Sequence, residues 1–153
     1  MQGLEVELRF LRLHPGAHVP CYQTSHAAGL DLHACLEGPV TLAPGDIAMI
    51  PCGFAMAIPH GFEGSVRPRS GLATKHGISM PNAPGTVDSD YRGEMKVPLI
   101  NLGREAFVVE HGMRVAQMVI APVARATVRE VSELDGTARG AGGFGSTGTG
   151  HRG

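Results

Sequence analysis

The class of fold is decided by the stretch Glu94-Met95-Lys96-Val97-Pro98-Leu99-Ile100-Asn101. In its first six residues polar and apolar side chains alternate, which is the period-two pattern of a β-strand with one buried face. Pro98 takes the place of a polar residue in this alternation. It has no N–H to donate to a strand ladder, so we expect it at a sheet edge or a bulge. The stretch therefore predicts a strand packed against a hydrophobic core.

Similar short segments lie on both sides of this stretch and are separated by Gly and Pro. They are residues 6–10, 29–34, 46–50, 54–58, 64–67, 107–110 and 115–123. Pro44-Gly45, Pro51 and Pro84-Gly85 are among the breakers between them. Turns at this spacing predict an all-β fold, a jelly-roll-like barrel or sandwich of many short strands. One short helix is expected over 70–76, with Ser70 as its cap and Gly77 at its end.

Composition agrees with a single β-domain. The chain has 153 residues, with 22 Gly, 11 Pro and only 18% charged residues, a composition that disfavours a helical bundle. We expect a β-domain over residues 1–135. Residues 136–153 are rich in Gly, Ser and Thr and lack hydrophobic periodicity, so we expect a flexible C-terminal arm there.

Charge and cysteine usage exclude several classes of partner. The 13 basic and 14 acidic residues give a net charge of −1, which argues against a nucleic-acid-binding surface. No apolar run reaches the roughly 18 residues needed to cross a bilayer, so no membrane partner is expected. The three cysteines form neither a disulfide framework nor a metal knuckle. These features predict a reduced, soluble protein of the cytoplasm.

Four segments could carry chemistry. In 67–71 (Arg-Pro-Arg-Ser-Gly), two guanidiniums and a helix start suit phosphate oxygens, although a solvated surface turn has the same composition. In 85–94 several charged groups crowd between glycines, as they also do in ordinary exposed loops. In 112–117 polar Arg114 and Gln117 interrupt an apolar strand, which implies a ligand or a structural ion pair. In 139–148 glycines surround Arg139 and Phe144, but the lysine of a phosphate-binding P-loop is missing.

Taken in order, these segments and 28–32 (Ala-Gly-Leu-Asp-Leu) resemble the five motifs of the trimeric deoxyuridine triphosphatase (dUTPase) family. The motifs match at 28–32, 68–73, 82–93, 112–117 and 139–148, so the resemblance spans most of the chain. It implies a jelly-roll-like homotrimer whose active sites are shared between subunits, with the arm of one subunit closing over a neighbour's site. The implied reaction is hydrolysis of dUTP to dUMP and diphosphate, which keeps uracil out of DNA and supplies dUMP for dTMP synthesis.

The resemblance also implies roles for particular residues. Asp88 is the expected catalytic base, which orients a water for attack on the α-phosphorus. Asp31 is expected to hold, through water, a Mg²⁺ cofactor carried by the triphosphate. The residues expected to bind dUTP are Arg69, Ser70, Gly71, Asn82, Gly85, Val87, Tyr91, Met95, Lys96, Gln117, Arg139, Phe144, Gly145, Ser146 and Thr147.

Within this set the family pattern suggests a division of labour. Asn82 and the backbone around Gly85 read uracil, Tyr91 lies against the deoxyribose, and Phe144 stacks on the base. Arg114 is expected to join the surroundings of Asp31 in a salt bridge. Met113 stands where the family commonly has Asp, which removes any ion pair that an acid at this position makes.

Two alternatives remain on the same fold. A dCTP deaminase uses a catalytic Glu after the base-binding turn, and Glu94 occupies such a position. A catalytically silent nucleotide-binding regulator is the second alternative, and it is expected to have lost Asp88 or the arm. The spacing of 88–91 and the presence of the arm favour the triphosphatase over both.

Overall fold

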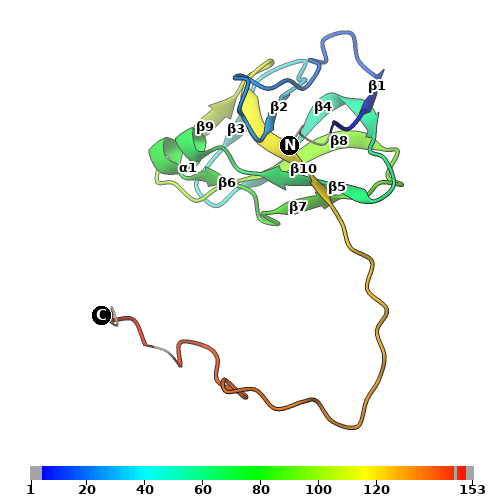
Figure 1. The fold of residues 1–153 in the computed structure, drawn as a ribbon. Helices are drawn as coiled ribbons and strands as arrows, with labels where there is room; N and C mark the ends of the chain where they lie inside the picture. Colours follow the sequence, from blue (N-terminus) through cyan, green and yellow to red (C-terminus); the bar gives the residue numbers. More distant parts are fainter. Residues whose placement is uncertain (1–4, 147, 151–153) are drawn as a thin grey trace.

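A computed structural model describes residues 5–146 and 148–150, and it folds them into an all-β, jelly-roll-like domain followed by an extended arm (Figure 1). One four-stranded antiparallel sheet has the order β1 (Arg9–Arg12), β4 (Ile47–Ala57), β8 (Glu94–Asn101), β6 (Ile78–Ser79). The other has the order β2 (Leu30–His33), β10 (Arg114–Pro122), β5 (Phe62–Arg67), β7 (Gly85–Val87). A third, two-stranded sheet joins β3 (Val40–Leu42) and β9 (Phe107–Val109).

Strand β8 has the bounds and the alternation that its sequence predicts. Met95, Val97 and Leu99 are buried, whereas Lys96 between them is exposed. Pro98 lies opposite Met49 of β4, and the pairing of β6 with β8 covers only Ile100 and Asn101. Pro98 therefore has no strand on its second side, which is the local edge that a residue without an N–H requires.

Strand β4 corrects the expectation that Pro51 separates two strands. Residues 47–57 form one strand, and its register with β8 shifts between Pro51 and Ala55. A bulge absorbs the extra residues, and Gly53 within it has a φ of 74°, which favours glycine. The strand expected at 6–10 is also displaced, because β1 begins at Arg9 and pairs with β4.

The short helix α1 (Ser70–His76) has the expected bounds but not the expected cap. Arg69 is the N-cap residue, no side chain caps the helix, and Ser70 is the first helical residue. The helix ends as expected at Gly77, whose φ is 70° and whose N–H donates to Ala73. The chain thus delivers Arg69 and Ser70 at the start of α1, directly after β5.

The core lies between the sheets and contains one fully buried polar residue. Its largest buried side chains include Phe54, Leu32 and Met118. Asn101 is completely buried, and its amide nitrogen donates to the carbonyls of Leu42 and Glu105, at 2.9 and 2.8 Å. Its side-chain oxygen accepts from Gly103 at 2.8 Å. These three bonds satisfy the buried amide and tie β8 to β3 and to the turn before β9.

Beyond β10 the chain leaves the domain. The N–H of Val123 donates to Gly61, and the following residues run away below the sheets (Figure 1). Val128 and Leu134 in this segment are 94% and 85% exposed. No helix among residues 5–146 and 148–150 is long and apolar enough to cross a membrane.

Candidate functional site

Three motifs that lie far apart in the sequence meet in one hollow of about 400 Å³. Strand β2 supplies Asp31, the turn from β5 to α1 supplies Arg69, and β10 supplies Gln117. The hollow is lined by Gln23, Ala27, Ala28, Gly29, Asp31, Arg69, Ser70, Gly71, Arg114 and Gln117. We call this hollow the phosphate subsite, because it gathers guanidinium, hydroxyl and amide donors around a helix start.

Two arginines share one carboxylate in the phosphate subsite. Arg114 Nη1 lies 3.0 Å from Asp31 Oδ2, and Arg69 Nε lies 3.5 Å from Asp31 Oδ1. Arg69 also donates to the backbone carbonyl of Arg114 at 3.1 Å. The salt bridge expected for Arg114 is therefore confirmed. Two positive charges against one negative charge leave a positive excess, which favours an anionic ligand such as a polyphosphate.

Gln117 connects β10 to the arginine-bearing turn. Its Nε2 donates to the Pro68 carbonyl at 3.1 Å. Its Oε1 lies over Gly29, where a Cβ would come within 2.6 Å of it. Gly29 is therefore needed for close approach of the Gln117 side chain. The amide holds the turn in place and still lines the phosphate subsite.

A second hollow gathers the residues of the third motif. Strand β7 pairs with β5, with Val66 opposite Gly85 and Gly64 opposite Val87, so the loop after it turns back towards β8. The hollow is lined by Met49, Asn82, Thr86, Val87, Asp88, Tyr91, Glu94, Met95, Lys96 and Pro98. We call it the nucleoside subsite, after the part of dUTP that the family resemblance implies for its residues. Met95 is 2% exposed and forms its floor, while Lys96 pairs with Glu94 at 3.6 Å.

The Asp88 carboxylate is not engaged by the neighbouring arginine. Arg92 Nη1 donates instead to the backbone carbonyls of Ser89 and Tyr91, at 2.8 Å each, and so closes the loop. Among the described residues, the ion pairs present involve neither Asp88 nor Asp90. Asp88 is therefore free to accept a proton from a water molecule or to orient one.

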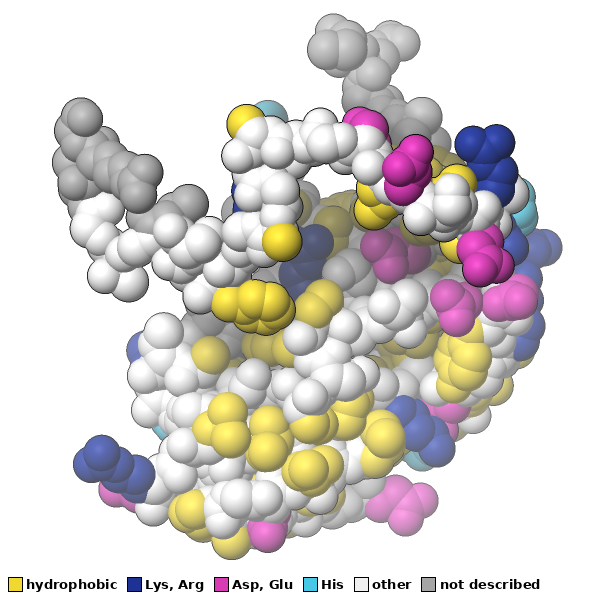
Figure 2. Space-filling model, turned by 90° about the horizontal axis from the view of Figure 1, so that it is seen from below, with side chains coloured by type: hydrophobic (Ala, Val, Ile, Leu, Met, Phe, Trp, Pro, Cys, Tyr) yellow, Lys and Arg dark blue, Asp and Glu magenta, His cyan; other side chains and the backbone are white. Residues whose placement is uncertain are grey.

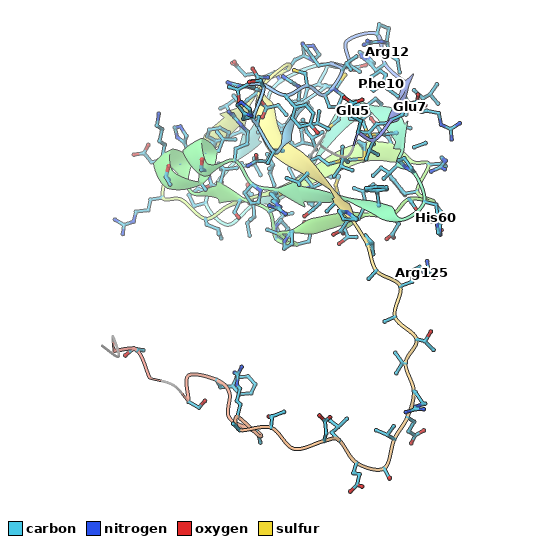
Figure 3. The ribbon with its side chains drawn as sticks, in the orientation of Figure 1. Glu5, Glu7, Phe10, Arg12, His60 and Arg125 are labelled. Carbon is cyan, nitrogen blue, oxygen red and sulfur yellow. The ribbon has the colours of Figure 1, made fainter. Side chains whose placement is uncertain are left out.

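Asp88 also lines a neighbouring hollow together with His60, Glu63 and Arg125. Figure 3 shows His60 in the β4–β5 turn and Arg125 just below it, on the segment that leads from β10 to the arm. This places the start of that segment beside the loop that bears Asp88. The sequence pattern did not single out His60 or Arg125, because neither belongs to a motif and only folding brings them there.

A single chain does not bring the two subsites together. The nucleoside subsite contains none of the residues of the phosphate subsite, and Asp88 lines no wall of the latter. The described residues of the arm line neither subsite; Arg139 bonds to the Gly142 carbonyl at 2.7 Å, and the Phe144 ring is fully exposed. Gly145 and Ser146 are also exposed, and Thr147 lies outside the described residues.

The donor set fits a Mg²⁺ that arrives on a polyphosphate better than a resident ion in a carboxylate cage. Within the described part of the chain, no three His, Cys, Asp or Glu side chains are grouped so as to hold a metal. Among the described residues that line the phosphate subsite, Asp31 is the only carboxylate, and both of its oxygens already face arginines. Mg²⁺ commonly keeps several waters and binds through one or two carboxylates plus substrate phosphates.

Sequence reasoning missed other residues of the two subsites. Gln23 lines the phosphate subsite, and Met49 and Thr86 line the nucleoside subsite. None of them carries a distinctive spacing, so only the fold reveals them. The sequence singled out Glu94 only for the deaminase alternative; its carboxylate contacts Lys96 of β8 and Gly53 of β4, and the contact with β4 could not be read from the sequence.

The sequence of this chain is similar to those of known proteins. Residues 16–148 match the model of the dUTPase family. A deoxyuridine 5'-triphosphate nucleotidohydrolase of Rhizobium etli is 64% identical over 135 residues, which cover 87% of this chain and 86% of that protein. The protein of the same name from Desulfotalea psychrophila is 60% identical over 130 residues, covering 85% and 87%.

Solved structures show the same fold. The dUTPase of Staphylococcus bacteriophage 80alpha with dUPNHPP has a TM-score of 0.85 at 25% identity, covering 94% of this chain and 99% of that one. A mutant dUTPase from phage phi11 of S. aureus, whose structure is described as showing how a structural Mg(II) ion is coordinated, has a TM-score of 0.76 at 22% identity. It covers 84% of this chain and 98% of that one. From its site geometry, its fold and its relatives, this chain belongs to the dUTPase family.

Proposed function

We propose that this protein hydrolyses dUTP to dUMP and diphosphate in the cytoplasm, which limits uracil in DNA and supplies dUMP for dTMP synthesis. The observation that carries the proposal is the meeting of Asp31, Arg69 and Arg114 in one positively charged hollow. This hollow has the donors that a triphosphate needs, in a chain whose relatives are named for this reaction.

The phosphates bind in the phosphate subsite. Arg69, Ser70 and Gly71 grip them at the start of α1, and Ser70 stabilises charge on the bridging oxygen of the leaving group. Gln117 keeps the arginine-bearing turn in place and completes the wall. Asp31 would hold, through water, a Mg²⁺ brought in by the triphosphate, and the ion would supply charge neutralisation for the leaving diphosphate.

Asp88 performs the step that makes the nucleophile. Its carboxylate orients a water molecule towards the α-phosphorus and accepts the proton as the water attacks. The bond between the α-phosphorus and the bridging oxygen breaks, and diphosphate leaves. That Arg92 is engaged by Ser89 and Tyr91 supports this role, because the Asp88 carboxylate is left to bind water.

The nucleoside subsite selects the substrate. Asn82 and the backbone at Gly85 and Val87 read the edge of uracil, and Met95 and Lys96 complete the wall. Tyr91 lies against the deoxyribose and leaves no room for a 2′-hydroxyl. A mismatched base leaves buried donors or acceptors unpaired, which costs on the order of 1–3 kcal/mol for each group.

The active enzyme is a homotrimer in which neighbouring subunits complete each site. The separation of the two subsites within one chain supports this arrangement. Ile47 and Met49 of β4 are 60% and 59% exposed, and Figure 2 shows hydrophobic side chains gathered on one face, as expected for surface covered by other subunits. The arm closes over a neighbour's site, where Phe144 stacks on uracil and Arg139, Gly145, Ser146 and Thr147 contact the phosphates.

The direct test compares dUTP, dCTP, dTTP and UTP as substrates, with Mg²⁺ and with EDTA. Metal-dependent diphosphate release from dUTP alone is the expected result. Asp88→Asn is expected to keep dUTP binding and lose turnover, because only the proton acceptor changes. Ammonia released from dCTP, or a wild-type protein that binds dUTP without turning it over, refutes the proposal in favour of a deaminase or a silent nucleotide-binding protein.

A further inference from the structure

The Tyr91 side chain in the nucleoside subsite is held in place by neighbouring residues. Its hydroxyl donates to the backbone carbonyl of Glu94 at 2.9 Å. The ring folds so closely over Gly93 that a Cβ there would lie 2.4 Å from the Tyr91 hydroxyl oxygen. The direction of the ring therefore depends on where the Glu94 carbonyl is held.

The Glu94 backbone is paired with Ala55 of β4, and its side chain reaches back to the bulge of the same strand. The bulge removes Gly53 from the β4–β8 ladder, and its N–H donates to Glu94 Oε1 at 3.2 Å. The Lys96 ammonium lies 3.6 Å from the other carboxylate oxygen. Glu94 therefore links two residues. Its carboxylate contacts the Gly53 N–H, and its backbone carbonyl contacts the Tyr91 hydroxyl.

The bulge is a firm anchor for these contacts. The Gly53 carbonyl accepts hydrogen bonds from the N–H groups of both Leu13 and His14, at 2.9 Å each. A Cβ on Gly53 would lie 2.7 Å from Cys35 Sγ, so the backbone is packed against the core on that side. Because Gly53 is held in place, its N–H can fix the position of the Glu94 carboxylate.

We infer that Glu94 is a positioning residue for sugar selection, which sets the orientation of Tyr91 through the carboxylate contact with Gly53. The inference rests on the proposed function only in giving Tyr91 the role of sugar wall. Glu94 touches neither water nor phosphate in this role. Its removal is expected to loosen rejection of the ribonucleotide rather than to stop hydrolysis.

The test measures kcat/KM for dUTP and for UTP in Glu94→Ala, Glu94→Gln and Tyr91→Phe, with Glu37→Ala as the control. Glu37 is an exposed glutamate on the loop between β2 and β3. In Glu94→Ala the ratio of the two kcat/KM values is expected to fall about tenfold, which corresponds to about 1.4 kcal/mol of lost discrimination. Its kcat and KM for dUTP are measured separately, because a positioning role for sugar selection should change the ratio between the two substrates more than kcat for dUTP.

Glu94→Gln retains an acceptor for the Gly53 N–H and is expected to keep the wild-type ratio. The double variant Glu94→Ala with Tyr91→Phe is expected to lose no more selectivity than either single variant, since both act through the same hydroxyl contact. An unchanged ratio in Glu94→Ala, losses that add in the double variant, or a Gln variant as poor as Ala each overturn the inference.

A second readout does not depend on catalysis. The chain has two tyrosines, so ¹⁹F NMR of protein labelled with 3-fluorotyrosine gives two signals, which Tyr22→Phe assigns. The Tyr91 signal is expected to shift and broaden in Glu94→Ala and to stay in place in Glu37→Ala. A Tyr91 signal that is identical in Glu94→Ala overturns the inference even if dUTP proves not to be the substrate, whereas a wild-type protein inactive on dUTP refutes only the proposed function.

Discussion

Replacing Asp31 by Asn tests whether one carboxylate organises the phosphate subsite. The substitution keeps the shape of the side chain but removes the charge that faces Arg69 and Arg114. Asp31 has a 10% exposed side chain, whereas those of the two arginines are 29% and 41% exposed. The substitution therefore breaks ion pairs in which the carboxylate is largely buried and the two arginine side chains are partly solvated.

The expected loss of stability follows from these exposures. Removing one partner of a fully buried ion pair costs about 3–5 kcal/mol. Water can solvate the two arginines once they are released, so we discount the cost to about 1–2 kcal/mol. For a chain of this length the loss corresponds to a melting temperature lower by about 3–6 °C. Melting must be compared at one protomer concentration, because assembly contributes to stability.

Binding should change in the opposite direction from stability. Without the Asp31 charge the phosphate subsite is more positive, so a non-hydrolysable dUTP analogue in EDTA should bind at least as tightly as it does to wild type. Turnover with Mg²⁺ should fall, because the substitution removes the carboxylate that we propose holds the metal through water. Calorimetry and diphosphate release measure these two quantities on the same preparation.

Asp135→Asn is the matched control, since Asp135 lies exposed on the arm and its neutralisation should change stability by less than about 0.5 kcal/mol. If Asp31→Asn melts within about 1 °C of wild type, the two arginines are not held by this carboxylate. If instead the analogue binds more weakly in EDTA, the positive excess is not what attracts the phosphates. Either result refutes the reasoning.

Two further predictions concern the cysteines and the arm. Burial, with the nearby Glu94 charge, raises the pKa of Cys52 to about 12 and also raises the pKa of Cys35. At neutral pH only the exposed Cys21 should therefore react quickly with a thiol reagent. All three cysteines should react in denaturant. Rapid labelling of a second thiol in the native protein would contradict the burial of Cys35 and Cys52. Truncation before Arg139 should leave a trimer with weak dUTP turnover, and light scattering that finds monomers would mean that the arm is structural.

Most of the elements that could be predicted have enough residues to show a period, although the three-residue strand β9 was also expected, at 107–110. Strand β8 and helix α1 have the bounds that alternation and turn residues indicate. Strands β3, β6 and β7 have only two or three residues, too few for a period, and their partners define them. Pro51 failed as a breaker because a bulge carries β4 past it, and a bulge depends on the opposite strand.

Many residues that line the two hollows could be predicted, but most of their contacts could not. Motif resemblance indicated Asp31, Arg69 and Asp88, and it also indicated the salt bridge of Arg114. That Arg92 would bond to backbone carbonyls rather than to the neighbouring carboxylates depends on the path of the loop. In the sequence, Asn101 is a polar residue at the end of a strand, with nothing to indicate burial. Its burial depends on hydrogen-bond partners up to 59 residues away.

Mixed trimers test most directly the claim that dUTP is hydrolysed at a site shared between subunits. Asp88→Asn and Arg69→Ala disable different subsites, and each alone should be nearly inactive towards dUTP. If Asp88 of one subunit serves the phosphate subsite of its neighbour, random equimolar mixing restores about a quarter of the sites, since each site needs two intact contributors at about one half each. Recovery near a quarter of wild-type diphosphate release is the predicted result. Activity that stays at the level of the separate variants would contradict the shared site.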